Sequence, residues 1–397
     1  MGRLTLLIAS MFLAAAVAAQ EVELREDHPR EYVVEEGDTL WDIAGMFLTR
    51  PWQWPAIWQA NPEIENPHLI FPGDLISLVY IDGEPRLVVD ETRRLSPEIR
   101  REAIDGPITT IPLDAIEEFL RRPRVVSEEE FDDLAYVVAN EEQRFYSSTG
   151  DRIYARGLDE DYSPGDEVIV GQLNYIFHEI PGTEDETGTR ETRRSRIGMA
   201  GQVRSYERMP TRFWQVVHSG QWERWPVLGL EMWEAGTARV LQTGDPAILE
   251  IVEGRREVTE GDRILPIDDH VYSPHFEPRA MADVPKNGRV LSLSEAYFGA
   301  GQYQIVALGL GEQDGVEAGH VFSTFHPGRT VRDDVRHPRL SGSSVGDRHS
   351  EWVDLPDEYS GQVMVFRTFE KVSYAIVMTG NREIRLGDVL GHPDRRL

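Results

Sequence analysis

The chain has 397 residues, carries 69 acidic against 41 basic side chains, and contains no cysteine. Its length allows two or three domains with cores of their own. The acidic excess argues against nucleic acid as a partner, because phosphate contacts need clustered cations. The lack of cysteine excludes disulfides, an acylated cysteine anchor, thiolate metal sites and cysteine nucleophiles.

The first nineteen residues are typical of a secretory signal peptide. One early cation, Arg3, precedes an apolar run over residues 4–17, and small residues lead up to Gln20. Because this run is too short and too early for a convincing membrane span, we predict a cleavable signal peptide at residues 1–19 and no integral membrane segment. A retained N-terminal anchor is the alternative.

Residues 32–78 present strand and helix signals in a defined order. A β-prone run at 32–34 ends at a glycine turn, and Asp38 or Thr39 is placed to cap a helix. Apolar side chains follow from Leu40 at i, i+3, i+4 and i+7, which is the spacing of one helix face. We therefore predict a strand followed by a first helix.

A second helix and a second strand complete this block. Pro55 suits the first turn of a helix, and Asn61 before Pro62 ends that helix, because a residue before proline avoids the helical region. Pro72-Gly73 predicts a turn, and residues 74–80 alternate like a strand. The predicted order is β-α-α-β.

This order of residues resembles the LysM module, a small fold that binds peptidoglycan and chitin. The resemblance rests on Gly37-Asp38-Thr39-Leu40-Trp41, Ile43-Ala44, Asn61-Pro62, Ile64, Asn66-Pro67 and Ile70-Phe71-Pro72-Gly73-Asp74. It departs from the module at residues 47–54, where the stretch between the helices is longer. The resemblance implies that N-acetylglucosamine chains lie in a shallow groove between the loop after the first strand and the loop before the second.

The binding residues that the resemblance implies lie in these two loops. They are Gly37, Asp38, Thr39, Leu40, Asn66, Pro67, Ile70, Phe71, Pro72 and Gly73. A glycan offers hydroxyls, acetamide groups and apolar ring faces, so its groove needs accessible backbone amides and a few apolar platforms. The glycines allow close approach of the backbone, and Ile70 and Phe71 can contact the sugar. The alternative is that the glycines only form turns and Ile70 belongs to the core.

Charge and aromatic content refine this hypothesis. The block holds seven acids and a single arginine, Arg50, so we expect glycan binding to rest on neutral hydrogen bonds and apolar contact. Trp41, Trp52, Trp54 and Trp58 are candidates for stacking on sugars. A domain this small needs large side chains in its core, however, and we predict that most of these tryptophans are buried.

The remaining chain is mainly strand. Residues 81–130 are interrupted by prolines and predict a connector with short helices, one over 113–120 and one capped by Ser127 with Glu130 as its reciprocal acid. Short β-branched and aromatic runs then predict strands. They lie at 136–138, 168–170, 238–241, 247–252, 303–306, 363–366 and 374–377. Residues 183–196 and 326–359 are too polar to bury and predict loops.

A Gly-Asp pair precedes several of these strands. Residues 236–265 and 361–390 are of equal length and share the order strand, strand, Gly-Asp turn, strand, which suggests two related β units. We interpret the pair as a turn in which glycine supplies a positive φ and the acid bonds local amides, in preference to a metal site.

The C-terminal segments resemble the TsaP family, periplasmic LysM proteins associated with the type IV pilus secretin. The resemblance rests on Arg124-Val125-Val126-Ser127, residues 301–306, 314–321, 355–358, 364–369 and 372–375. It implies a C-terminal part similar to the flagellar FlgT C-terminal domain. It also implies two partners, peptidoglycan glycan strands and the outer-membrane secretin. The insert at 183–196 departs from the family, and the resemblance transfers no secretin-contacting residue.

Together these patterns predict an α+β fold, a small βααβ LysM domain followed by a mainly-β region with short helices. The predicted divisions are 1–19 signal peptide, 30–80 LysM domain, 81–130 connector, 131–272 β-rich domain and 273–397 FlgT-like β-rich domain.

An enzyme is the competing class. The histidines are scattered, no Gly-x-Ser-x-Gly elbow occurs, and no large helical domain is present to hold a catalytic glutamic acid. We therefore predict no catalytic residue, metal or cofactor, and a periplasmic protein that anchors a secretin to the cell wall. A scaffold of another envelope machine and a peptidoglycan hydrolase with an unrecognised site are the alternatives.

Overall fold

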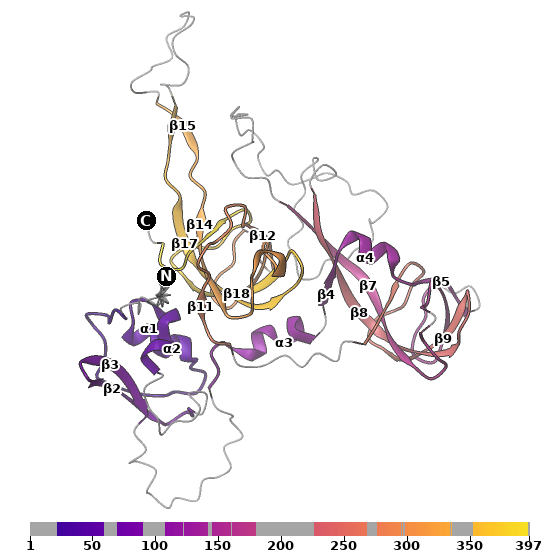
Figure 1. Cartoon of the computed structure of the whole chain (residues 1–397), viewed down its shortest axis with the longest axis horizontal. Helices are drawn as coiled ribbons and strands as arrows, with labels where there is room; N and C mark the ends of the chain where they lie inside the picture. The colour runs from indigo at the N-terminus through magenta and orange to yellow at the C-terminus, as the bar shows by residue number, and fades with distance from the viewer. Residues whose placement is uncertain are drawn as a thin grey trace, which may run out of the picture.

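The computed structural model describes residues 22–58, 70–89, 108–121, 123–141, 145–159, 161–179, 226–267, 276–294, 296, 298–333, 335 and 352–395. The expected signal peptide, the loop residues Asn66 and Pro67, and the insert at 183–196 lie outside this part of the chain. The described residues form an α+β fold, with an N-terminal unit that contains helices and a mainly-strand remainder (Figure 1). This agrees with the predicted fold class.

The N-terminal module, residues 22–89, packs short helices against a small antiparallel sheet. Its elements are β1 (Glu31–Val33), α1 (Leu40–Phe47), η1 (Pro51–Gln53), α2 (Trp54–Trp58), β2 (Leu75–Ile81) and β3 (Glu84–Val89), with the strands in the order β1-β2-β3. Thr39 caps α1, because its side chain accepts a hydrogen bond from the Asp42 N–H at 3.2 Å. The predicted first strand, first helix and second strand are confirmed as β1, α1 and β2. The predicted second helix is α2, which starts at Trp54, and β3 is a further strand.

The tryptophans of the module are all buried, as predicted. Trp54 and Trp58 lie in the module's own core with Ile43 and Phe47. Trp41 and Trp52 lie in a different apolar cluster, which they share with residues far along the chain. The module therefore has a core of its own and a second apolar face that packs against the rest of the protein.

The predicted connector, residues 81–130, adds one strand to the sheet on each side of it. Helix α3 (Leu113–Arg121) precedes β4 (Pro123–Val126) and α4 (Glu128–Asp133), while β3 belongs to the N-terminal sheet. Both predicted helices are present. The Ser127 hydroxyl accepts the Glu130 N–H at 3.1 Å at the start of α4, which confirms the predicted cap.

Six strands close into a first barrel. They are β5 (Tyr136–Asn140), β6 (Arg152–Arg156), β7 (Glu167–His178), β8 (Val227–Gln242), β9 (Ala247–Gly254) and β10 (Arg263–Leu265). The hydrogen-bonded order β8-β7-β10-β5-β6-β9 returns from β9 to β8, and β4 adds to the other half of β8. Closure leaves few free strand edges, and small and branched aliphatic side chains such as Ala235, Val168 and Leu249 fill the interior.

A second barrel follows. Its strands are β11 (Arg279–Ala280), β12 (Val290–Leu293), β13 (Ile305–Leu308), β14 (His320–His326), β17 (Glu358–Thr368), β18 (Ser373–Gly380) and β19 (Val389–Gly391), with a 3-10 turn, η5 (Glu312–Asp314), before β14. The order β14-β17-β18-β13-β12 is completed by β19, which pairs with β14 and is bridged to Arg289 beside β12. The strands β15 (Thr330–Arg332) and β16 (Trp352–Asp354) form a hairpin that projects from β14 and β17 (Figure 1).

The two barrels have the same connectivity. Strands β5 to β10 correspond in order to β12, β13, β14, β17, β18 and β19. Gly261 N–H donates to Val137 O in the first barrel and Gly387 N–H donates to Val290 O in the second, each at 2.8 Å. The prediction that residues 236–265 and 361–390 are related units is confirmed, and the likeness extends beyond them to the complete ring.

The projecting hairpin corrects one expectation. Residues 326–359 are predicted as a loop because they are polar, but their ends pair as β15 and β16, with Val331 opposite Val353. Polarity alone excluded burial and did not exclude pairing, because a two-stranded ribbon can expose its side chains while its backbone groups bond to each other.

The Gly-Asp pairs are turns with one shared geometry. Gly261 and Gly387 have φ of 92° and 81°, in the left-handed region that favours glycine. The following carboxylate closes the turn, since Asp262 accepts the Thr259 N–H at 2.8 Å and Asp388 accepts the Arg385 N–H at 3.0 Å. The structural interpretation of these pairs is therefore confirmed.

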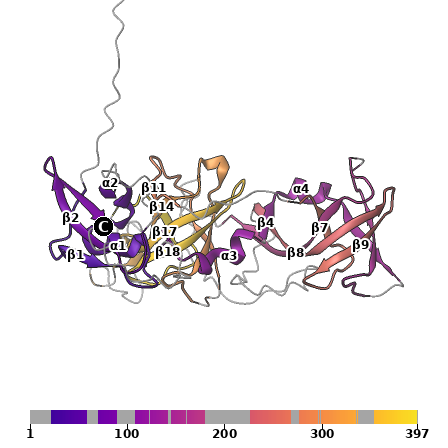
Figure 2. The ribbon, with the colours of Figure 1, turned by 90° about the horizontal axis from the view of Figure 1, so that it is seen from below.

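The second barrel lies between the N-terminal module and the first barrel, although it comes last in the sequence (Figure 2). Its strands β17 and β18 are buried on both faces. Val363, Val365 and Ala375 point into the barrel, while Phe366 and Tyr374 belong to a cluster outside it. Burial on both faces explains why these two strands are continuously apolar instead of alternating.

The buried Asp262 predicts a pH-dependent stability. Burial raises the pKa of its carboxyl to about 6, above the unfolded value of 3.8. The unfolded chain therefore loses this proton first as the pH rises from 4 to 6, so the folded state becomes less stable over that interval. Asp262→Asn removes the titration. Its free energy of unfolding relative to that of the natural chain should rise between pH 4 and pH 6.5, by on the order of 3 kcal/mol.

The matched control for this measurement is Asp166→Asn. Asp166 closes the same kind of turn by accepting the Ser163 N–H at 2.8 Å, but at an exposed position. Thermal unfolding from pH 4 to pH 7 should separate the two variants. Parallel pH profiles for Asp262→Asn and the natural chain would contradict the prediction.

Candidate functional site

The structure places the predicted binding residues on two neighbouring turns of the N-terminal module. Gly37 and Gly73 are exposed, Asp38, Phe71 and Pro72 are half-buried, and Thr39, Leu40 and Ile70 are buried, with Ile70 fully so. Asn66 and Pro67 are outside the described residues. The glycines and Phe71 therefore lie at the rim, while Leu40 and Ile70 lie beneath it.

Backbone bonds join the two turns into one unit. Gly73 N–H donates to Val34 O at 2.8 Å, and Val34 N–H donates to Asp74 O at 2.9 Å. Each turn is closed by its own aspartate, because Asp38 accepts the Glu35 N–H and Asp74 accepts the Phe71 N–H. The loops that flank the predicted groove are thus held in register before any ligand arrives.

The polar side chains of the first loop serve the module's own structure. The Asp38 carboxylate also accepts the Tyr32 hydroxyl at 2.8 Å, and burial together with this bond raises the pKa of Tyr32 to about 12. The Thr39 hydroxyl donates to Asp42 while it caps α1. Of the predicted loop residues, Phe71 and Pro72 place half-buried apolar side chains at the rim.

Gly37 and Gly73 have the same environment. Their φ values are 92° and 93°, and an added Cβ at either position would have no heavy atom within 4 Å. The geometry of these two glycines is therefore compatible with both roles considered from the sequence, the turn and the close approach of a ligand. The turn requires the positive φ, and the open space beyond it lets another molecule approach the backbone closely.

A segment of the chain lies across both loops. We call residues 108–111 the strap. Leu40 N–H donates to Thr109 O at 3.0 Å, and Ile108 N–H donates to Ile70 O at 2.8 Å. Ile108 is buried in the core of the N-terminal module. The strap therefore bonds one backbone group in each loop of the predicted groove.

Sequence reasoning missed the strap, although a local signal exists. Ile108-Thr109-Thr110-Ile111 is a β-branched run between Pro107 and Pro112, which predicts a short extended segment. Nothing in such a run indicates its partner, because extended segments can pair wherever a backbone donor and acceptor are free. The pairing with Leu40 and Ile70 emerges only in three dimensions.

The second barrel contacts the module at the start of α1. The Tyr303 hydroxyl lies 2.8 and 2.6 Å from the two carboxylate oxygens of Asp42 and donates to them. Burial, with the Asp42 charge beside it, raises the pKa of this hydroxyl. Arg50 forms an ion pair with Asp394 at 3.4 Å. These contacts join residues more than 250 positions apart, so no local pattern predicts them.

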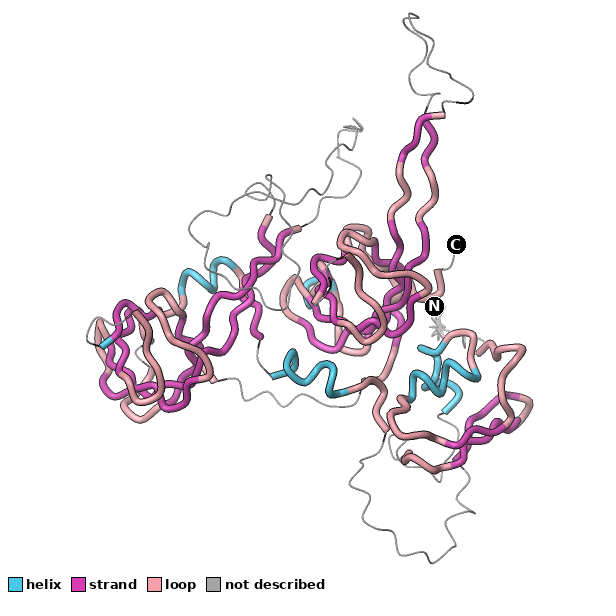
Figure 3. The backbone as a smooth tube through the Cα atoms, turned by 180° about the vertical axis from the view of Figure 1, so that it is seen from behind, coloured by secondary structure: helices cyan, strands magenta, loops and turns pink. Residues whose placement is uncertain are grey.

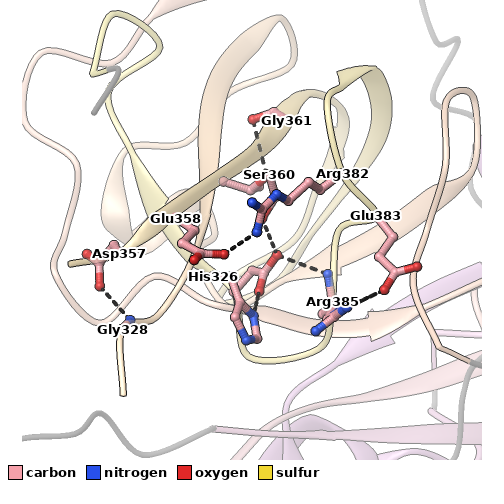
Figure 4. A network of polar contacts seen from close by, with 11 residues as sticks. His326, Gly328, Asp357, Glu358, Ser360, Gly361, Arg382, Glu383 and Arg385 are labelled. Atoms are coloured by element: carbon pink, nitrogen blue, oxygen red, sulfur yellow. Dashed lines mark hydrogen bonds and ion pairs between the residues drawn. The ribbon is translucent and has the colours of Figure 1, made fainter. Parts of the chain in front are cut away.

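A cluster in the second barrel has the residue types of a hydrolase triad without its arrangement. Asp388 accepts the Ser360 hydroxyl at 3.0 Å, and His326 Nδ1 lies 3.0 Å from its other oxygen (Figure 4). The carboxylate lies between serine and histidine, so the serine O–H is bonded to the acid and not to a base. A nucleophilic serine needs the opposite order. Burial raises the pKa of Asp388, which serves as the turn acid before β19.

Two further searches of the described residues bear on function. No cluster of three or more histidine, aspartate or glutamate side chains there could hold a metal ion. No helix in the same residues is both long and apolar enough to cross a membrane.

Substitution of the rim glycines tests the turn geometry. Gly37→Ala and Gly73→Ala should each destabilise the module by about 1 kcal/mol, because alanine disfavours a positive φ even where space is open. Gly45→Ala is the matched control, since Gly45 lies inside α1 and an added Cβ would meet Pro51 at an ordinary 3.6 Å. The control should stabilise by about 0.5–1 kcal/mol. Urea unfolding followed by tryptophan fluorescence measures both, and equal effects would contradict the prediction.

Comparison with known proteins identifies the N-terminal module. Residues 32–78 match the LysM domain family. An uncharacterized protein of Bacillus subtilis (strain 168), YqbP, is 38% identical over 60 residues, which is 13% of this chain and 27% of that protein. The chain thus matches about a quarter of the relative's length. Residues 32–78 are a LysM domain, which is a binding domain and not a catalytic one, and its presence suggests peptidoglycan binding and association with the cell wall.

Proposed function

We propose that this protein is a non-catalytic periplasmic protein that binds peptidoglycan through its LysM domain and anchors an outer-membrane secretin, that of the type IV pilus, to the cell wall. The observation that carries the proposal is the LysM domain at residues 32–78, whose two glycine turns are held in register by their own backbone bonds. The signal peptide predicted at residues 1–19 supports the periplasm as its location.

The proposed glycan-binding residues are those of the two loops. They are Gly37, Asp38, Thr39, Leu40, Asn66, Pro67, Ile70, Phe71, Pro72 and Gly73. In this set, Phe71 and Pro72 supply apolar contact, and the backbone of the glycine turns supplies hydrogen bonds. Asp38 and Thr39 act through the shape of the loop, because their side chains bond within the module.

The arrangement of the parts supports a bridging role. The LysM domain lies at one end of the molecule, the first barrel lies at the other, and the hairpin of β15 and β16 projects from the second barrel on the side of the LysM domain (Figures 1 and 3). We propose the divisions 30–80, 81–130, 131–272 and 273–397, in which the two β-rich parts, 131–272 and 273–397, each contain one barrel. Residues beyond 130 would then contact the secretin, as the resemblance to the TsaP family implies.

Binding to purified sacculi tests the wall contact. Phe71→Ala should weaken co-sedimentation of the protein with sacculi by about fivefold or more, because it removes the apolar platform at the rim. Phe145→Ala is the matched control, since Phe145 is 87% exposed and lies between β5 and β6 of the first barrel, which is at the opposite end of the molecule from the LysM domain (Figure 2). A Phe71→Ala variant that sediments like the natural chain would contradict the proposed site.

Detergent extraction of the cell envelope tests the other end of the bridge. The natural chain and Phe71→Ala should both co-purify with a ring-forming outer-membrane secretin, because the substitution affects the wall contact alone. Recovery of a different envelope assembly would favour the general scaffold. Release of soluble muropeptides from sacculi by the purified chain would establish the hydrolase alternative instead.

A further inference from the structure

The strap occupies the groove that the LysM domain would offer to a glycan. Thr109 O accepts the Leu40 N–H of one loop, and Ile108 N–H donates to Ile70 O of the other. Leu40 lies three residues after Gly37, Ile70 lies three residues before Gly73, and they are 2% and 0% exposed. The strap therefore pairs the backbone N–H of Leu40 in one loop and the backbone C=O of Ile70 in the other.

These are the groups that a sugar chain would need. The Leu40 N–H can donate to an acetamide or hydroxyl only if it is not already paired with Thr109 O, and Ile108 occupies the apolar space beside the two loops. Resting on the proposed function, we propose that the strap is a built-in competitor of peptidoglycan. In the arrangement described here the groove is closed, and glycan binding requires residues 108–111 to leave it.

The strap is held at both ends. Ile108 is buried in the LysM core, while Ile111, fully buried, belongs to the apolar cluster shared with the second barrel. The chain then continues into α3, whose carbonyls at Phe119 and Leu120 accept the Arg367 guanidinium at 2.7 and 2.9 Å. Release of the strap would therefore disturb the packing of Ile111 and α3 on the second barrel.

A hydrogen bond from Tyr303 to Asp42 also links the second barrel to the LysM domain. Tyr303 bonds Asp42 of α1 from a backbone with φ of 64°, an unfavourable conformation for a residue other than glycine. The bond to Asp42 offsets this strain while the LysM domain is docked. Undocking would lose the bond and let the backbone relax. Release of the strap and undocking of the LysM domain from the second barrel are thus coupled: each makes the other more favourable, and the unit has a closed, docked state and an open, undocked state.

Glycan affinity of full-chain variants tests the competition. The probe is a soluble N-acetylglucosamine oligomer, titrated by calorimetry into the mature chain. Ile108→Ala weakens the strap and should tighten binding by about tenfold or more, because the cost of opening falls. Tyr303→Phe removes the tie to Asp42 and should also tighten binding, by about threefold to tenfold. Binding to sacculi should change in the same direction.

Two matched controls separate opening from general loss of stability. Ile251→Ala creates a comparable cavity in the first barrel, and Tyr80→Phe removes a hydroxyl from an exposed tyrosine of the same LysM domain. Both should bind the oligomer as the natural chain does, within about twofold. If Ile108→Ala lost its cooperative thermal transition, Tyr303→Phe would decide the question alone.

Amide hydrogen exchange supplies a readout that affinity does not. Saturating oligomer should speed exchange in a peptide that contains Ile108–Ile111 of the natural chain, because the Ile108 N–H loses its Ile70 acceptor. Equal affinities of all variants, with exchange at the strap unchanged by the oligomer, would overturn the competition and leave peptidoglycan binding intact. Failure of every variant to bind both oligomer and sacculi would overturn the proposed function itself.

Discussion

The arrangement of the whole molecule depends on one apolar cluster centred on Tyr374. Its ring lies between Phe119 of α3 and Phe177 of β7, with centroids 6.0 and 6.3 Å away, and its hydroxyl donates to the buried Glu231 of β8. The same cluster receives Trp41 and Trp52 from the LysM domain. Because burial of such large rings is the strongest driving force available to the chain, this cluster holds the LysM domain, α3 and both barrels in one arrangement.

A second constraint works at the scale of single turns. The sequence x-x-Gly-Asp recurs at the groove and in both barrels, each time with glycine at positive φ and the acid closing the turn onto an amide three residues earlier. At the three part-buried turns the carboxylate saves an N–H from being left unpaired, and at Asp38 it bonds an exposed one. The same local device therefore shapes the two loops of the LysM domain in one part of the chain and precedes the last strand of each barrel in another.

The groove and the cluster are linked through the strap. Ile108 belongs to the LysM core and Ile111 to the cluster around Tyr374, so four residues connect the two glycine-turn loops of the LysM domain to the second barrel. A wall anchor with a separately mobile LysM domain would bind glycan regardless of its partners. In the proposed competition, the position of the LysM domain on the barrel sets access to its groove, and wall binding would depend on the state of the rest of the protein.

The sequence by itself determined the LysM domain, its cap at Thr39, the burial of its tryptophans and the existence of two related β units, because each depends on local periodicity or turn chemistry. It also indicated the loops around Gly37 and Gly73. The tertiary structure alone decided that Leu40 and Ile70 are covered by the strap, that Asp42 is bonded by Tyr303, and that the last barrel lies in the middle. These features join residues dozens to hundreds of positions apart, and a local pattern specifies that a group can bond without specifying which distant group it meets.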